Sequence, residues 1–299
     1  MHELVIIIAG PTASGKSQLA IDVALELNGV IVNADSMQVY RNVPILSATP
    51  FKEDLKTVEH VLYGTKDIFE EGSVMEWLES AALAIRKIWK EGKTPIVVGG
   101  TGFYIDALLN GISEIPKTDR ADLPPLAEMH EALKNFDRES YERLNPNDVS
   151  RVTRAYCVFK TTGKSLSQWQ KESNKKVLPE AKFLVIKLVP PIAELEKRIV
   201  ERFDDMMKKG ALEEAKQIFE LNLDRSLSGM KTLGLPELLD FLKGKNTWEE
   251  AVSLAKLHSR QYAKRQRTWF NNKLEADITL THCYEQEKEV LKRILAVAQ

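Results

Sequence analysis

Hydrophobic runs separated by amphipathic stretches dominate the N-terminal third of the chain. The run at 4–8 is continuous, largely β-branched and followed by Ala9-Gly10. Similar short runs occur at 30–32 and 95–98. Apolar runs of this length are typical of parallel strands that are buried on both faces. We therefore expect these three segments to be strands of one sheet.

Helical patterns fill the intervals between these strands. The first interval predicts a helix at about 16–27, because Asn28-Gly29 then stops it. Ser73 and Glu76 have the spacing of a capping box, so a longer helix is expected from there to about Gly92. Strands that alternate with helices predict a doubly wound α/β sheet.

The pattern changes in the middle of the chain. From about 123 to 170 it is helical, and one more strand is expected at Lys182–Val189, followed by helices to the C-terminus. A helical block inserted between two strands of one sheet is the simplest arrangement. We expect a catalytic core made of residues 1–122 and 178–299, and an all-helical insertion domain at 123–177.

Composition narrows the class of protein only slightly. The 299 residues are 43% hydrophobic and 28% charged, with a net charge of −1, as in ordinary soluble proteins. No stretch approaches the roughly 18 apolar residues of a membrane span, and the first run is too short for a signal peptide. A cytoplasmic protein is expected. Cys157 and Cys283 have no disulfide or zinc-ligand spacing and are expected to be buried free thiols.

A phosphate-binding motif lies between the first expected strand and helix. Gly10, Pro11, Thr12, Ala13, Ser14, Gly15, Lys16 and Ser17 satisfy G-x-x-x-x-G-K-[ST]. The backbone amides of such a P-loop and the dipole of the following helix bind an anion. Lys16 adds a positive charge, and the Ser17 hydroxyl is a candidate Mg²⁺ ligand.

The motif identifies phosphates rather than a reaction. Most P-loops bind ATP or GTP, so a nucleotide or small-metabolite kinase is a natural starting hypothesis. Asp35 follows the second expected strand, whereas Gly99-Gly100-Thr101-Gly102 after the third contains no acid. Asp35 could therefore serve either as a metal ligand or as a base.

Two windows without any acidic residue carry clustered positive charge. They are Val149–Lys171 and Ala251–Leu274. In the second, Arg260, Lys264 and Arg267 have the spacing of one helix face. Local stripes of this kind can bind RNA phosphates, although a charged run is more often a solvated face. These residues alone leave both interpretations open.

Several segments together resemble the tRNA dimethylallyltransferase (tRNA isopentenyltransferase) family, in its bacterial form. The segments that carry the resemblance are Gly10–Ser17, Asp35–Arg41, Val98–Tyr104, Asn147-Asp148 with Arg151 and Arg154, Thr162–Lys164, Glu201–Met207 and Arg260–Gln266. They follow one another in order over nearly the whole chain. The resemblance therefore favours a transferase over a kinase.

The resemblance implies a P-loop NTPase-like α/β fold and a defined reaction. A dimethylallyl group passes from dimethylallyl pyrophosphate to the exocyclic amine of the adenosine on the 3′ side of the anticodon. The P-loop then holds pyrophosphate with Mg²⁺, and Arg202 matches the family's pyrophosphate-binding arginine. Asp35 matches its general base, with Thr101 as a positioning group. We expect the protein to be a monomer.

The resemblance also implies contacts with the anticodon stem-loop of tRNA. The implied tRNA-binding residues are Asp35, Ser36, Met37, Gln38, Thr101, Ser150, Arg151, Val152, Thr153 and Arg154, together with the basic face of Arg260, Lys264 and Arg267. The chain departs from the family pattern at 46–49, at 59–61 and at Leu235-Pro236. These departures concern the range of RNA substrates rather than the catalytic positions.

Overall fold

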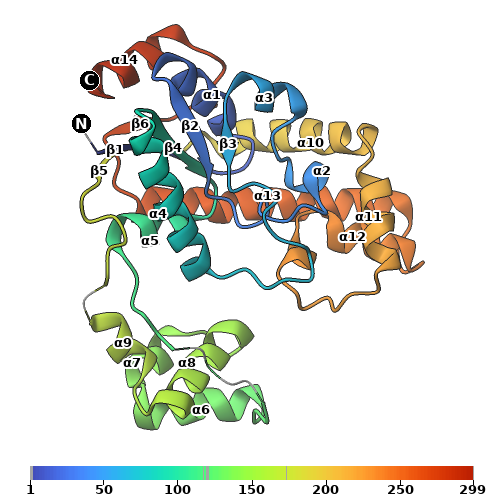
Figure 1. Ribbon diagram of the computed structural model, residues 1–299. Coiled ribbons are helices and arrows are strands. Elements are labelled where there is room, and N and C mark those ends of the chain that lie inside the picture. The colour runs from blue at the N-terminus through green and yellow to red at the C-terminus, as the bar shows by residue number, and fades with distance from the viewer. Residues whose placement is uncertain (1–2, 117, 119–120, 173, 299) are drawn as a thin grey trace. The chain divides into compact units, whose positions relative to one another are not determined.

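Six parallel strands form one sheet in the computed structural model, which describes residues 3–116, 118, 121–172 and 174–298 (Figure 1). The strands are β1 (Leu4–Ala9), β2 (Gly29–Asn33), β3 (His60–Val61), β4 (Thr94–Gly99), β5 (Lys182–Leu188) and β6 (Ile278–Leu280), in the order β3-β2-β4-β1-β5-β6. Ile6 of β1 pairs with Ile96 on one side and Leu184 on the other. The expected α/β sheet is confirmed, and its order brings the carboxyl ends of β2, β4 and β1 together.

Two of these strands were not expected from the pattern. β3 is two residues long, and β6 interrupts the region that was predicted to be wholly helical. That prediction of uninterrupted helices was wrong, because Ile278–Leu280 pairs with the exposed edge of β5. Strands of two or three residues at a sheet edge carry too few positions for a periodic signal.

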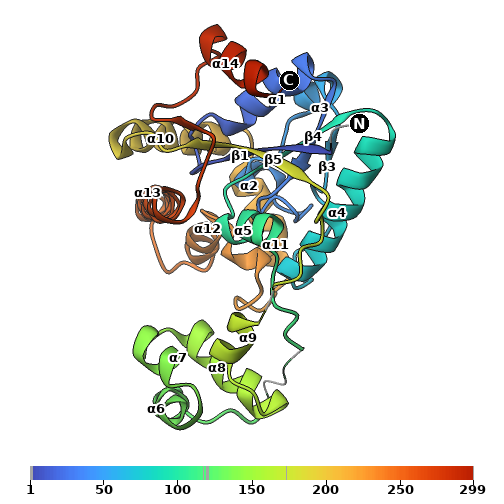
Figure 2. The same cartoon turned by 90° about the vertical axis from the view of Figure 1, so that its left-hand side faces the viewer.

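Helices cover both faces of the sheet. The helices of this unit are α1 (Lys16–Glu26), α2 (Pro44–Ser47), α3 (Lys52–Thr57), α4 (Val74–Lys90), α5 (Gly102–Asn110), α10 (Ile192–Lys208), α11 (Ala211–Glu220), the 3₁₀ turn η1 (Gly229–Lys231), α12 (Leu235–Leu242), α13 (Trp248–Lys273) and α14 (Lys288–Ala298). Side chains of α1 and α14 pack with β1, β2 and β5 in one core cluster. Figure 2 shows α4 on the opposite face of the sheet from α1 and α14.

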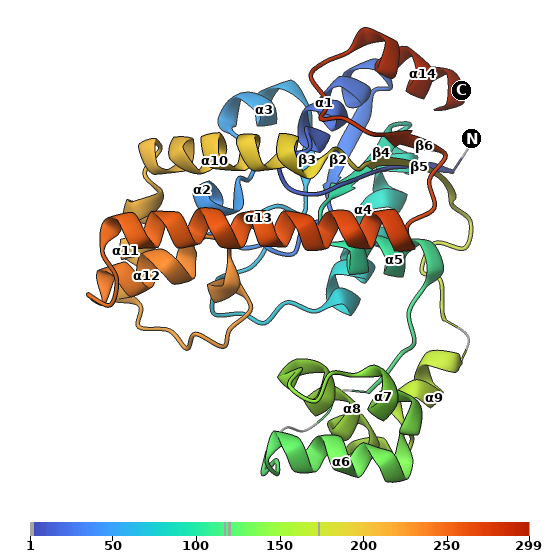
Figure 3. The same ribbon diagram turned by 180° about the vertical axis from the view of Figure 1, so that it is seen from behind.

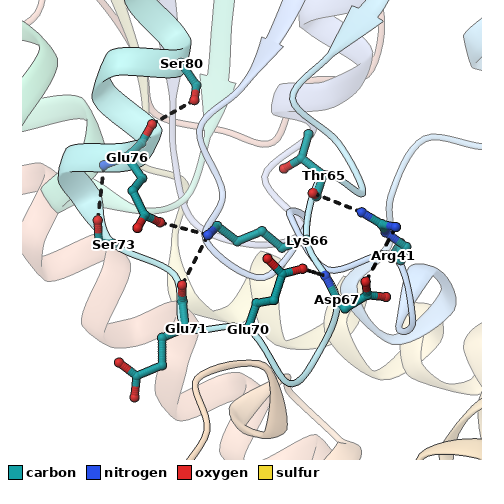
Figure 4. Close-up of polar contacts among 9 residues, drawn as sticks. All are labelled: Arg41, Thr65, Lys66, Asp67, Glu70, Glu71, Ser73, Glu76 and Ser80. Atoms are coloured by element: carbon teal, nitrogen blue, oxygen red, sulfur yellow. Dashed lines mark hydrogen bonds and ion pairs between the residues drawn. The ribbon is translucent and has the colours of Figure 1, made fainter.

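The expected capping box at α4 is only half formed. The Ser73 hydroxyl accepts a hydrogen bond from the Glu76 amide at 3.1 Å. The Glu76 carboxylate, however, lies 2.8 Å from the Nζ of Lys66, outside the helix (Figure 4). An ion pair with the neighbouring loop therefore replaces the reciprocal bond to the capping residue.

A second compact unit comprises Asn110–Lys176, and the first comprises Met1–Leu109 with Val177–Gln299. The second unit contains α6 (Leu126–Phe136), α7 (Arg138–Arg143), α8 (Val149–Thr162) and α9 (Leu166–Lys171). Leu133, Ala155, Val158 and Leu166 form its core. It begins at Asn110, before the expected start at 123, and Ile112 forms a bridge with Lys175 near its two ends.

Two smaller expectations concern sulfur and membranes. Cys157 and Cys283 are both buried, as expected, and do not form a disulfide. Within the described ranges, none of the helices combines the length and apolar character that crossing a bilayer requires.

Candidate active site

The P-loop connects β1 to α1 and adopts a backbone that few residues tolerate. Gly15 has a φ of +88°, and Ala13 has a φ of +66°. A Cβ on Gly15 would lie 2.5 Å from the carbonyl oxygen of Tyr284. Glycine is therefore required at this position both by conformation and by space.

Residues of the C-terminal segment contact the backbone carbonyls of the P-loop. The Tyr284 amide donates to the Ser14 carbonyl at 3.0 Å, and the Cys283 thiol lies 3.7 Å from the Ala13 carbonyl. The Tyr284 hydroxyl in turn donates to Asp22 on α1 at 2.7 Å. These contacts hold the P-loop backbone in place through its carbonyl groups. The N-terminus of α1 remains available to an anion.

Two cations meet at the P-loop. Lys16 Nζ donates to the Pro11 carbonyl at 3.3 Å. Desolvation lowers the pKa of Lys16 to about 8; the nearby Asp35 carboxylate opposes this shift, and Arg202 adds to it. Arg202, on α10, donates to the Thr12 hydroxyl at 3.1 Å, and burial lowers the pKa of its guanidinium as well. Two poorly solvated positive charges beside a P-loop make a site for a multiply charged anion.

Asp35 and Thr101 come from neighbouring strands and meet at the same edge of the sheet. The Thr101 hydroxyl accepts from the Ser36 amide at 2.9 Å, and the Thr101 amide donates to the Ala34 carbonyl at 3.3 Å. Asp35 Oδ1 accepts from the Met37 amide at 2.9 Å. The two residues that sequence reasoning paired are therefore joined by direct contacts between their loops.

The surroundings of Asp35 are aromatic. Burial, followed by the charge of Asp35, raises the pKa of the phenols of Tyr63 and Tyr262. Burial also raises the pKa of Tyr104 to about 12, with smaller contributions from Tyr40 and Asp35. Three phenols therefore lie within electrostatic range of the Asp35 carboxylate.

A cavity of about 290 Å³ adjoins the P-loop. Ser17, Arg202 and Asp205 are among its polar lining residues. Its apolar lining comprises Ile21, Ile31, Ile45, Phe51, Val98 and Met206, among others. The cavity therefore places apolar surface beside a phosphate site.

The loop that follows Asp35 is held by the segment after β3. The Gly64 amide donates to the Gln38 carbonyl at 3.0 Å, the Arg41 amide donates to the Lys66 carbonyl at 2.9 Å, and the Lys66 amide donates to the Val39 carbonyl at 2.9 Å. Figure 4 shows the side chains of the same region: Arg41 faces Thr65 and Asp67, and Lys66 faces Glu71 and Glu76. Gln38 donates to the Ala48 carbonyl at 2.6 Å, so its amide is engaged with the end of α2.

The predicted tRNA-binding residues of α8 differ in exposure. Arg151 is 75% exposed and pairs with Asp148 at 3.4 Å. Ser150 is exposed and Thr153 is half-buried. Arg154 donates to the Thr118 hydroxyl at 3.0 Å. Val152 is fully buried, so its side chain packs inside the second unit rather than on its surface.

The basic face of α13 is also divided. Lys264 is exposed, whereas Arg260 and Arg267 are half-buried. Arg267 donates from Nε to the Pro190 carbonyl at 2.6 Å. Lys264 is therefore the most accessible of the three side chains.

Sequence reasoning missed several residues that shape the site. Glu214 on α11 accepts hydrogen bonds from the amides of Ile45 and Leu46 at 2.8 and 2.9 Å, and burial raises the pKa of its carboxyl. Gln266 on α13 contacts the P-loop and the loop after β4. The Arg260–Gln266 motif was the one signal that pointed to Gln266. Glu214 is one of three glutamates in α11, and no motif distinguished it from the others.

Comparison with known proteins gives a consistent result. The sequence model of the family described as IPP transferase matches residues 38–273. The chain is 43% identical over 273 residues to a tRNA dimethylallyltransferase of Hyphomonas neptunium, covering 88% of this chain and 86% of that protein. It is 37% identical over 292 residues to the enzyme of the same name from Rickettsia conorii, covering 95% and 80%.

Solved structures agree with the sequences. A tRNA isopentenylpyrophosphate transferase from Bacillus halodurans superposes with a TM-score of 0.73 at 30% identity, over 100% of this chain and 96% of the other. A eukaryotic dimethylallyltransferase acting on tRNA superposes with a TM-score of 0.84 at 30% identity, over 99% of this chain and 78% of the other.

Proposed function

The chain belongs to the IPP transferase family, and we propose that it transfers a dimethylallyl group from dimethylallyl pyrophosphate to tRNA. The acceptor is the exocyclic amine of the adenosine on the 3′ side of the anticodon, and pyrophosphate is released. The observation that carries this proposal is the contact between the Thr101 and Asp35–Ser36 loops beside a P-loop with two cations. Relatives named tRNA dimethylallyltransferase support the same reaction.

The P-loop side of the site fits the leaving group. Breaking the allylic C–O bond leaves negative charge on pyrophosphate and positive character on carbon. We assign Lys16 and Arg202 to the first charge, and the N-terminus of α1 adds backbone donors on the same side. Gly10, Pro11, Thr12, Ala13, Ser14, Gly15 and Ser17 complete this pyrophosphate site. The adjoining apolar cavity surface suits a hydrocarbon group rather than a second phosphate.

The donor chemistry around Ser17 also fits Mg²⁺. Ser17 is exposed and lines the same cavity as Asp205, whose carboxylate also pairs with Lys208 at 3.4 Å. Magnesium prefers oxygen ligands and completes its shell with water and substrate phosphates. When bound it neutralises part of the pyrophosphate charge. No group of three or more His, Cys, Asp or Glu side chains suited to a metal occurs among the residues that the structure describes.

The acceptor side requires a base. As the amine nitrogen attacks the allylic carbon, a C–N bond forms, the C–O bond breaks, and the nitrogen loses one proton. We assign the proton to the carboxylate of Asp35, which is placed by its bond to the Met37 amide. Thr101 positions the same loop through Ser36. The carboxylate also favours adenine, because its exocyclic amine is a hydrogen-bond donor.

We propose the RNA contacts from the exposure of the polar and basic side chains. Arg151, Ser150 and Lys264 are exposed and can reach phosphates, while Arg154, Arg260 and Arg267 already have partly buried surroundings. Such contacts orient the anticodon stem-loop, and the reacting adenosine leaves its stack to enter the site. We propose that the enzyme acts as a monomer in the cytoplasm, where its tRNA substrate is found.

The ATP-dependent kinase is not favoured, because every comparison points to a transferase. Two variants test the transferase assignment. Asp35→Asn should retain binding of dimethylallyl pyrophosphate but lower the transfer rate by about 10²–10⁴-fold. Lys16→Met should weaken donor binding itself. Near-normal turnover by Asp35→Asn would rule out the assigned base.

A further inference from the structure

Gln266 reaches between the two loops of the active site from a third element. Figure 3 shows α13 as one long helix that runs beside α10, and Gln266 lies near its C-terminal end. The side chain is 6% exposed. Its Oε1 accepts from the Thr12 amide at 2.9 Å, and its Nε2 donates to the Gly100 carbonyl at 2.8 Å.

The two bonds use both ends of the side-chain amide. A backbone N–H of the P-loop needs an acceptor, and a carbonyl of the loop after β4 needs a donor. Among side chains of this length, only glutamine offers both groups while remaining uncharged. The bonds also assign the orientation of the amide, because the reverse orientation would place like groups opposite one another.

The loop after β4 is shaped to receive this helix closely. A Cβ on Gly100 would lie 2.4 Å from Nε2 of Gln266. A Cβ on Gly102 would lie 2.3 Å from the indole of Trp269, which follows Gln266 on α13. Two glycines therefore allow α13 to approach the loop that carries Thr101.

The two loops joined by Gln266 carry opposite halves of the reaction. Thr12 accepts a hydrogen bond from Arg202 through its hydroxyl, which places it on the pyrophosphate side. Gly100 precedes Thr101, which bonds to Ser36 next to Asp35 on the adenosine side. Thr12 and Gln266 are 254 residues apart in the sequence, so this link between the loops forms only through tertiary packing.

We propose that Gln266 is a positioning residue that sets the separation between the pyrophosphate loop and the Asp35–Thr101 pair. It touches neither substrate in this role. Its effect is on the distance between the allylic carbon and the amine nitrogen, and a misplacement of about 1 Å can cost about 10²-fold in rate. This inference rests on the proposed transferase function.

Two variants of different chemistry test the inference. Gln266→Glu keeps the size and the acceptor but faces the Gly100 carbonyl with a second acceptor. Gln266→Met removes both bonds at similar volume, and so covers the case in which the charged variant does not fold. Gln217→Glu, on the exposed side of α11, is the matched control for the change of charge.

Steady-state kinetics on the full-length protein separate positioning from simple structural damage. We expect kcat of both Gln266 variants to fall about 10–100-fold. The Kd for dimethylallyl pyrophosphate and the KM for tRNA should change less than about threefold, which is much less than the expected fall in kcat. Gln217→Glu should match the wild type, and thermal unfolding followed by circular dichroism should show that each variant is folded.

Acid rescue gives a second readout, which tests the bond to the Gly100 carbonyl directly. Protonating the carboxyl introduced by Gln266→Glu restores a donor to the Gly100 carbonyl. The ratio of variant to wild-type kcat should therefore rise as the pH falls, while that of Gln266→Met should stay flat. Asp35, Lys16, Arg202 and Tyr262 are the charged or titratable groups near this position. Both proteins contain these same groups, so their effects on kcat largely cancel in the ratio.

The outcomes distinguish the inference from the function on which it rests. Wild-type kcat in both folded variants, or a loss confined to donor affinity, would overturn the positioning role. A wild-type protein that transfers no dimethylallyl group to tRNA would overturn the proposed function, and this inference with it.

Discussion

The pKa of Lys16 predicts a pH dependence of donor binding. Desolvation lowers this pKa to about 8, so the ammonium is about nine-tenths charged at pH 7 and about one-tenth charged at pH 9. If only the charged form holds pyrophosphate, the affinity for dimethylallyl pyrophosphate falls about tenfold between these values. Binding an anion raises the pKa again, because opposite charge favours the ammonium form.

A titration of the apo-protein with a non-reacting thio-analogue of the donor measures this effect. The Kd should be constant below about pH 7 and rise above about pH 8, following the pKa of Lys16. Lys16→Arg is the control, because a guanidinium keeps its charge throughout this range. Ionisation of the donor affects both proteins equally. Equal pH profiles for the wild type and Lys16→Arg would refute the reasoning.

Three further predictions concern the supports of the site and its RNA contacts. Gly15→Ala should weaken donor binding more than about tenfold by calorimetry, since a left-handed residue costs about 1–2 kcal/mol and its Cβ would also meet the Tyr284 carbonyl; unchanged affinity would contradict this. Glu214→Ala should lower the free energy of unfolding in urea by about 2–4 kcal/mol, because two amides lose their acceptor; a loss below about 0.5 kcal/mol would show that water replaces it. Arg151→Glu should raise the KM for tRNA severalfold without changing that for the donor, whereas Arg138→Glu, also exposed in the second unit, should change neither; equal effects of the two would remove the specific role of Arg151.

The elements of the fold that the sequence revealed are those with a strong local signal. β1 and β4 are buried apolar runs, and the P-loop has fixed spacing between Gly10 and Ser17. Because parallel strands present their carboxyl ends at one edge, Asp35 could also be placed near the loop. The edge strand β6 was missed, since its pairing with β5 depends on an existing sheet.

The residues that hold the loops of the site in place could not be predicted from the sequence in the same way. Gln266, Glu214 and Tyr284 each make two hydrogen bonds to segments far away in the sequence. No periodicity or spacing records such contacts, because they depend on how helices pack after the sheet has formed. The exposure of charged residues has the same origin: Lys264 and Arg267 share a helix, yet Lys264 is exposed and Arg267 is half-buried.

A transfer assay with labelled dimethylallyl pyrophosphate, Mg²⁺ and unmodified tRNA tests the central claim most directly, with ATP added in parallel as a competitor. The predicted result is label on the adenosine 3′ to the anticodon, in an amount that excess ATP does not lower. Absence of label from every tRNA, together with consumption of ATP, would contradict the account and would favour the ATP-dependent kinase instead.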